Sequence, residues 1–199
     1  MLDAGANFGW YTTHFARYVG EGGKVFAFEP IYSTFKELEE NIKLNHISNA
    51  ALINQALGDK KGETSFFVSQ EFRGSGGASR YNYYGKRIPV TMTTLDDFAD
   101  EHHIKRLDFI KADIEGGEFH MLLGGQKTLE RFHPRLVFEI QEWHTERFGH
   151  KPKAVFDLLA GLGYRAFAMG SDGKLTEEFD PAVLPPELMN HGFYFEANR

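Results

Sequence analysis

The chain has 199 residues, 42% apolar and 25% charged, a composition typical of a globular domain rather than a disordered segment. It carries 22 Lys and Arg against 28 Asp and Glu, and this net charge of −6 argues against a nucleic-acid partner, because phosphate binding needs a basic surface. Cysteine is absent, which excludes disulfides and thiolate chemistry and favours a cytoplasmic location, and no apolar run is long enough for a membrane span.

Strand-like and helix-like segments alternate along the sequence. The expected strands are 24–28, 50–54, 64–68, 88–92, 107–112, 135–140, 164–169 and 192–196. The expected helices are 11–19, 33–44 with Ser33 or Thr34 as N-cap, 95–103 capped by Thr94, 118–130, and 153–161. The alternation predicts a single α/β domain over residues 1–199, with a mostly parallel sheet and helices on both faces. Strands 64–68 and 88–92 are expected to pair antiparallel, and the last strands to add antiparallel at one edge.

The first strand is unusually short in the sequence. Only Met1 and Leu2 precede the first loop motif, whereas strands usually have about five or six residues. We therefore expect the first strand to be truncated relative to that of a parent protein.

A glycine-containing loop, DAGANFG, follows this short strand and precedes a helix. Gly5 and Gly9 allow a tight turn and a close ligand approach, and the helix that begins near Trp10 offers free N–H groups. The loop lacks the middle glycine of the dinucleotide fingerprint G-x-G-x-x-G, and no G-K-[ST] follows as in a P-loop. A nucleotide-like ligand other than a dinucleotide is therefore favoured.

Two acidic residues narrow the choice of ligand. Asp3 stands before the glycine turn and suits an amine, and Glu29 ends the second strand, 26 positions later, where a carboxylate can accept both ribose hydroxyls. A ribose clamp combined with an amine-binding acid describes S-adenosylmethionine.

Several motifs together carry a family resemblance from Asp3 to about Ile140. In chain order they are DAGANFGWYT, VFAFEP, NQALGD, TTLDDF and DFIKADIEGGE. This series resembles the FkbM-type S-adenosylmethionine-dependent methyltransferases. The resemblance implies a Rossmann-like class I methyltransferase fold, with a seven-stranded, mostly parallel sheet whose last strand is antiparallel. It also implies O-methylation of a small sugar-like or secondary-metabolite acceptor, with S-adenosylhomocysteine as product.

The resemblance assigns cofactor contacts to four parts of the chain. The first loop and helix, at the methionine end, would contribute Asp3, Gly5, Ala6, Asn7, Gly9, Tyr11 and Thr12. Glu29 would hold the ribose, and Pro30 and Ile31 would border the adenine. Asn54, Gln55 and Ala56 would lie near the adenine edge, with Asp113 completing the set. Asp59, in the same loop as Asn54, reads equally well as a turn residue.

The segment KADIEGGE places chemistry-bearing residues at the end of a central strand. A buried Lys111 is costly unless it is paired, and Asp113 or Glu115 could be its partner. Removal of an acceptor proton needs a base, for which the candidates are Asp113, Glu115, Glu139 and His144. Glu118 suits the first turn of the next helix. No H-x-x-x-H or H-E-x-x-H pattern occurs, so no metal is expected, although a carboxylate-only magnesium site is conceivable.

Residues 69–87, rich in Gly, Ser, Tyr and Arg, are expected to form a lid or an acceptor-recognition loop. Two alternatives to a methyltransferase remain open at this point. One is a NAD-dependent oxidoreductase, disfavoured by the G-x-x-x-G spacing. The other is a non-catalytic, methyltransferase-like binding module.

Overall fold

Five parallel strands form one side of the main sheet in the computed structural model, which describes residues 1–68, 78–79, 86–170, 172–179 and 190–198. These strands are β1 (Leu2–Ala4), β2 (Val25–Phe28), β3 (Ala50–Ile53), β8 (Phe109–Ala112) and β9 (Arg135–Gln141). Their spatial order is β3-β2-β1-β8-β9, so the chain direction across the sheet reverses beside β1. Ligands of open α/β sheets bind at such a reversal, outside the carboxyl ends of the strands.

Three further strands extend this sheet beyond β9. They are β10 (Tyr164–Met169), β11 (Leu175–Phe179) and β12 (Asn190–Ala197). β12 pairs antiparallel with both β9 and β10, which confirms the expected antiparallel last strand. The sheet has eight strands rather than the expected seven, because β11 pairs with the outer edge of β10. Its polar sequence, LTEEF, carries no apolar strand pattern that could have predicted it.

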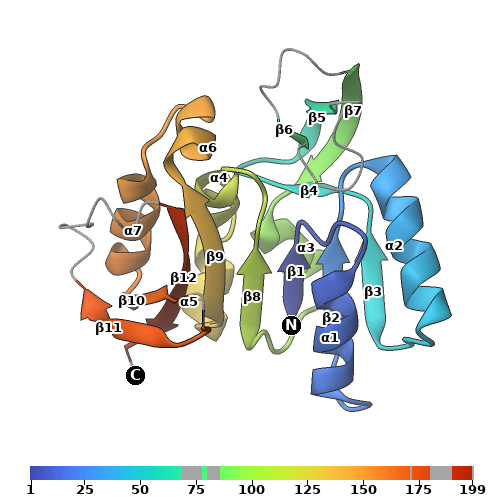
Figure 1. Cartoon of the computed structure of the whole chain (residues 1–199), viewed down its shortest axis with the longest axis horizontal. Helices are drawn as coiled ribbons and strands as arrows, with labels where there is room; N and C mark the ends of the chain where they lie inside the picture. The colour runs from blue at the N-terminus through green and yellow to red at the C-terminus, as the bar shows by residue number, and fades with distance from the viewer. Residues whose placement is uncertain (69–77, 80–85, 171, 180–189, 199) are drawn as a thin grey trace.

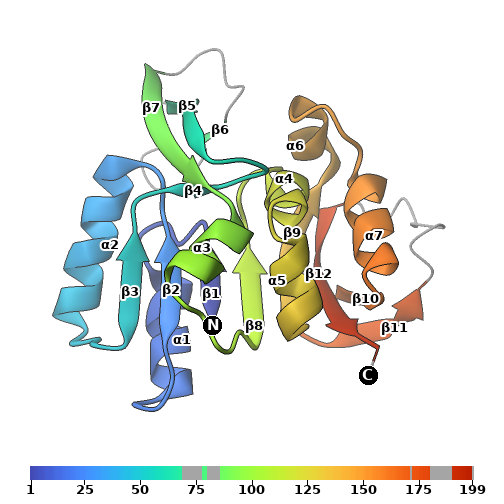
Figure 2. The same ribbon diagram turned by 180° about the vertical axis from the view of Figure 1, so that it is seen from behind.

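Helices cover both faces of the sheet. They are α1 (Trp10–Val19), α2 (Tyr32–Leu44), α3 (Leu95–Glu101), α4 (Glu118–Leu123), α5 (Gln126–Phe132), α6 (Glu142–Arg147) and α7 (Pro152–Gly161). Side chains alternate along β2: the rings of Phe26 and Phe28 contact Phe98 of α3, whereas Ala27 packs with Leu38 of α2. Figures 1 and 2 show α1 on one face of the sheet and α3 and α5 on the other.

Two expectations about helix ends are wrong, and one is confirmed. The predicted helix 118–130 is divided into α4 and α5 at Gly124, where an added Cβ would lie 2.1 Å from the Gly58 carbonyl oxygen. Helix α2 begins at Tyr32 with Ile31 as N-cap, without a side-chain cap from Ser33 or Thr34. Thr94 does cap α3, because its hydroxyl accepts the backbone N–H of Asp97 at 3.0 Å.

A second, smaller sheet lies beyond the carboxyl ends of the main strands (Figure 1). It contains β4 (Ala56–Leu57), β5 (Gly62–Val68), β6 (Ala78–Ser79) and β7 (Lys86–Thr93), in the order β4-β7-β5-β6. β5 and β7 pair antiparallel, as expected. Most of the expected lid, residues 69–77 and 80–85, lies outside the described residues. Among the described helices, none is long and apolar enough to cross a membrane.

Candidate functional site

The loop between β1 and α1 lies at the carboxyl edge of the sheet and has an unusual backbone. Gly5, Asn7 and Gly9 all adopt positive φ angles, of 76°, 51° and 92°. The backbone N–H groups of Gly5 and Ala6 both donate to the Phe28 carbonyl, which ties the loop to the end of β2. A Cβ on Gly5 would lie 2.0 Å from the carbonyl oxygen of Asp113. Glycine is therefore required there both by conformation and by the close approach of the neighbouring strand end.

Asp3 is fully buried on β1 and is only partly satisfied. Its Oδ2 accepts the Thr12 hydroxyl at 2.7 Å, which links the strand to the first turn of α1. Its Oδ1 is buried and has no hydrogen-bond partner among the described residues. Burial raises the pKa of Asp3, while Lys111 and the Thr12 hydroxyl oppose that rise. A buried carboxylate oxygen that accepts no hydrogen bond is costly, and the cost is removed when a ligand donates to it.

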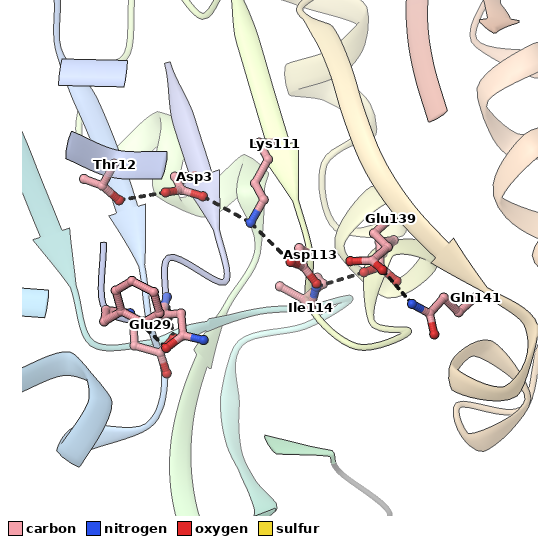
Figure 3. A network of polar contacts seen from close by, with 11 residues as sticks. Asp3, Thr12, Glu29, Lys111, Asp113, Ile114, Glu139 and Gln141 are labelled. Atoms are coloured by element: carbon pink, nitrogen blue, oxygen red, sulfur yellow. Dashed lines mark hydrogen bonds and ion pairs between the residues drawn. The ribbon is translucent and has the colours of Figure 1, made fainter. Parts of the chain in front are cut away.

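Lys111 confirms the expectation that a buried lysine in this strand needs a carboxylate partner. Parallel pairing sets it directly beside Asp3, and its Nζ lies 3.7 Å from Asp3 Oδ1. The same Nζ lies 3.5 Å from Oδ2 of Asp113, the expected partner, and 4.8 Å from the centroid of the Tyr11 ring. One ammonium thus serves two carboxylates, as the close view in Figure 3 shows.

Glu29, at the end of β2, is held by the loops on either side of it. The backbone N–H of Asn7 donates to its Oε2 at 3.0 Å, and the N–H of Ile31 donates to its Oε1 at 2.9 Å. Burial raises the pKa of Glu29 to about 7, although these two hydrogen bonds oppose the shift. The Asn54 side-chain amide donates to the carbonyls of Glu29 and Pro30, so Asn54 fixes the backbone of this turn.

These residues fit the cofactor that the sequence predicts. Asp3 Oδ1 has a free acceptor position for an ammonium group, and each Glu29 oxygen has a second lone pair for a ribose hydroxyl. The other predicted contacts spread along the same edge. Gln55 stands between β3 and β4, and Ala56 is buried in β4, where it pairs with Met92 of β7.

Asp113 and Glu115 lie in the loop after β8, which is anchored to α6. The His144 Nε2 lies 2.9 Å from Oε2 of Glu115. Glu115 has a φ of 58°, a conformation that costs energy in a residue with a side chain. An added Cβ on Gly116 would lie 2.5 Å from the His144 carbonyl oxygen. Two of the four candidate bases, Glu115 and His144, are thus brought together as a pair.

Glu139 lies near the end of β9, on the same side of the sheet as Lys111. Residues 111 and 137 are register partners, so Asp113 and Glu139 each follow that pair by two residues. Partial burial raises the pKa of Glu139, and the nearby charges of Asp113 and Glu115 raise it further. Gln141 donates to Glu139 Oε1 at 2.5 Å, and the indole N–H of Trp143 donates to Gln141 at 2.7 Å. Sequence reasoning missed Gln141 and Trp143, although their alternation after Glu139 was a usable signal.

Glu118, at the start of α4, has a larger role than its predicted place in the first turn. It is completely buried, and its Oε1 accepts the N–H of Ile114 at 2.9 Å. Burial raises the pKa of Glu118 to about 8, so the carboxyl group is mostly neutral at pH 7. Its hydrogen bond with the Ile114 N–H holds the loop that carries Asp113 and Glu115. Asp59 lies exposed in a turn, as do His102 and His103 at the end of α3. Among the described residues, no group of three or more His, Asp or Glu could hold a metal ion.

Comparison with known proteins assigns this arrangement to a family. Residues 3–166 match the model of the methyltransferase FkbM domain. The chain belongs to the FkbM methyltransferase family. A 2-O-methyltransferase, NoeI, of Sinorhizobium fredii is 26% identical over 190 residues, which cover 87% of this chain and 76% of that protein. "Methyltransferase 1" of Beauveria bassiana is 24% identical over 143 residues, covering 62% of this chain and 57% of that relative.

Solved structures confirm the class I methyltransferase fold of this FkbM chain. The FkbM methyltransferase of Methylobacillus flagellatus superposes with a TM-score of 0.60 at 18% identity, covering 98% of this chain and 42% of that one. A putative methyltransferase from Streptococcus mutans, in complex with S-adenosylhomocysteine, gives 0.53 at 12% identity, with 98% and 86% covered. The chain thus spans about half the length of the Beauveria bassiana relative and of the Methylobacillus flagellatus structure.

Proposed function

We propose that this FkbM-family chain is an S-adenosylmethionine-dependent methyltransferase that methylates a hydroxyl of a small, sugar-like or secondary-metabolite acceptor. The observation that carries the proposal is that Asp3 and Glu29 lie at the carboxyl ends of two neighbouring strands, β1 and β2. Asp3 presents a buried oxygen that has no hydrogen-bond partner among the described residues, and Glu29 presents two oxygens held by backbone N–H groups. Family membership favours this function over that of a NAD-dependent oxidoreductase.

Binding would be divided between these two carboxylates. Asp3 Oδ1 accepts the ammonium of the cofactor's methionine part, and Thr12 keeps the other oxygen in place. Glu29 accepts the ribose hydroxyls in its ionised form. Pro30, Ile31 and Asn54 shape the neighbouring turn for the adenine. The bound cofactor supplies a methyl group that is already activated by its sulfonium.

The chain's remaining work is to orient the acceptor and to remove its proton. The Glu139 carboxylate is the general base that electrostatics favour, because its raised pKa brings it closer to that of a hydroxyl. Asp113 orients the acceptor from the adjacent strand end. The contact between Glu115 Oε2 and His144 Nε2, at 2.9 Å, holds the loop that carries Asp113 against α6, the helix that follows β9. The proton passes from the acceptor oxygen to Glu139 as the oxygen takes the methyl group.

The negative charge at the acceptor side favours a small hydroxyl-bearing acceptor over a nucleic acid. Asp113, Glu115 and Glu139 meet at the acceptor side, where they oppose the approach of a phosphate-rich polymer. The likeness to an rRNA methylase of Streptococcus thermophilus, at 14% identity and a TM-score of 0.54, concerns the fold alone. The relative NoeI, by its name, is a 2-O-methyltransferase, which agrees with a hydroxyl acceptor.

A transfer assay with methyl-labelled S-adenosylmethionine tests this proposal. The chain is incubated with methyl glycosides, phenolic alcohols, primary amines and a structured RNA, and label is traced to each product by mass spectrometry. We expect label on a hydroxyl oxygen of the first or second class. Label only on amines or RNA contradicts the acceptor class. Tight cofactor binding without transfer to any of the four classes contradicts the methyltransferase assignment and favours a binding module.

A further inference from the structure

Lys111 stands between the cofactor side and the acceptor side of the site. The Lys111 residue is only 7% exposed, and it belongs to β8, next to β1. Asp3 belongs to the cofactor side, whereas Asp113 belongs to the loop that faces the acceptor. The two N···O distances, 3.7 and 3.5 Å, are nearly equal.

Neither distance is that of a formed hydrogen bond, for which N···O values of about 2.7 to 3.2 Å are usual. The ammonium is therefore shared between two carboxylates without being committed to either. This agrees with the absence of a hydrogen-bond partner for Asp3 Oδ1 among the described residues. The three groups together carry one net negative charge when all are ionised. Glu29 lies near the Asp3 end of this group, and Glu139 and Glu118 lie near its Asp113 end.

A second cation at Asp3 changes this balance. The ammonium that the proposed function places on Asp3 Oδ1 would lie close to the Lys111 ammonium, and like charges in a buried place repel strongly. Lys111 has a flexible stem and a second carboxylate within 3.5 Å, so a small rotation relieves the repulsion. Displacement from Asp3 and attachment to Asp113 are then one movement.

We propose that Lys111 is a positioning residue that couples the two sides of the site, moving from Asp3 to Asp113 when the cofactor's ammonium occupies Asp3. This inference rests on the proposed function. It implies that an ionised Asp113 helps the cofactor bind by giving the displaced lysine a partner. By reciprocity, a bound cofactor holds Asp113 ionised beside Lys111, ready for the acceptor.

A double-mutant cycle on S-adenosylhomocysteine binding, measured by calorimetry, tests the coupling. Asp113→Asn is made in the wild-type background and in two neutral backgrounds, Lys111→Met and Lys111→Gln, each checked by thermal unfolding. We expect Asp113→Asn to weaken binding about fivefold when Lys111 is present and less than twofold when it is absent, a coupling of ordinary size for groups in contact. An equal factor in all backgrounds overturns the inference, because any direct effect of Asp113 on the cofactor persists without Lys111.

A second test uses the wild-type chain, so it does not depend on whether a variant folds. The side-chain carboxyl carbon of Asp113 is followed by NMR through a pH titration, with and without saturating S-adenosylhomocysteine. Closer pairing with Lys111 predicts that the midpoint moves to lower pH in the complex. An unchanged or higher midpoint contradicts the inference. Absence of S-adenosylhomocysteine binding by the wild type would instead overturn the proposed function itself, so the two failures are distinguishable.

Discussion

Thr12 donates a 2.7 Å hydrogen bond to one carboxylate oxygen of Asp3, while the other oxygen is buried without a hydrogen-bond partner among the described residues. This half-satisfied state is what a ligand-binding carboxylate is expected to show before its ligand arrives. Removing its charge while keeping its shape therefore tests what the carboxylate contributes to ligand binding, together with its ion pair to Lys111.

Asp3→Asn is predicted to weaken S-adenosylhomocysteine binding about 10- to 100-fold, because a hydrogen bond to a charged group contributes about 1.5–3 kcal/mol. Asp59→Asn, at an exposed turn, is the matched control and should leave the affinity unchanged. Calorimetry on both variants measures the difference. An affinity within twofold of wild type for Asp3→Asn would remove Asp3 from the cofactor site.

The pKa of Glu29 predicts a pH dependence of cofactor binding. Burial raises that pKa to about 7, and the ionised form is the better acceptor for two ribose hydroxyls. Affinity for S-adenosylhomocysteine should therefore rise with pH, by up to about tenfold between pH 6 and 8 for a single linked proton. Glu29→Gln should bind more weakly and should lose this dependence. A wild-type affinity that is flat, or that falls over this range, would contradict the role of Glu29.

The same pKa has a consequence for the stability of the free chain. Because the folded-state pKa of Glu29 is above its unfolded value of 4.5, the folded chain binds more protons than the unfolded chain between pH 4.5 and 7. The contribution of Glu29 to the free energy of unfolding therefore falls as pH rises through that window and levels off above it. Chemical denaturation of wild type and Glu29→Gln at pH 5 and 8 compares the two slopes.

Glu139→Gln separates chemistry from binding. Loss of the base should lower kcat by about 10²- to 10⁴-fold, the usual range for general-base catalysis, with S-adenosylhomocysteine affinity unchanged. Glu146→Gln, on the exposed side of α6, is the control. A Glu139→Gln enzyme with wild-type kcat would transfer the role of base to Asp113 or to the Glu115–His144 pair.

Gly5→Ala tests the close approach between the first loop and the end of β8. A Cβ at position 5 would meet the Asp113 carbonyl oxygen at 2.0 Å, at a φ of 76°. Gly149 has nearly the same φ, 79°, with no atom within 4 Å of an added Cβ, so Gly149→Ala carries only the conformational cost of about 1–2 kcal/mol. Gly5→Ala should lower the free energy of unfolding by clearly more than Gly149→Ala. Equal losses would show that the contact is not tight.

The sequence predicts the central α/β pattern well because the parallel strands are short, apolar runs between amphipathic helices. It fails where the local signal is weak or misleading. The apolar periodicity of 118–130 continues through Gly124 and Gly125, yet contact with the Gly58 backbone separates α4 from α5. β11 has the sequence LTEEF, in which only Leu175 and Phe179 are apolar, and it forms where the edge of β10 is available for pairing and Phe179 packs against Phe156 and Phe193.

The sequence predicts which residues form the candidate site more completely than it predicts the contacts between them. Asp3, Glu29, Lys111 and Asp113 could be named from their places at strand ends, since parallel strands bring these ends to one edge. The sharing of Lys111 between two carboxylates depends on register across β1 and β8, which the sequence does not encode locally. The burial of Glu118 likewise depends on packing around α4, whereas the sequence indicates only that an acidic residue suits the first turn of that helix.

Binding of S-adenosylhomocysteine to the wild-type chain, measured by calorimetry at pH 8 with NAD as the control ligand, decides whether this strand edge is the cofactor site. The arrangement of Asp3 and Glu29 predicts micromolar binding of S-adenosylhomocysteine and no measurable binding of NAD. Absence of S-adenosylhomocysteine binding to the folded chain, or equal binding of NAD, would contradict the assignment of this strand edge as the cofactor site.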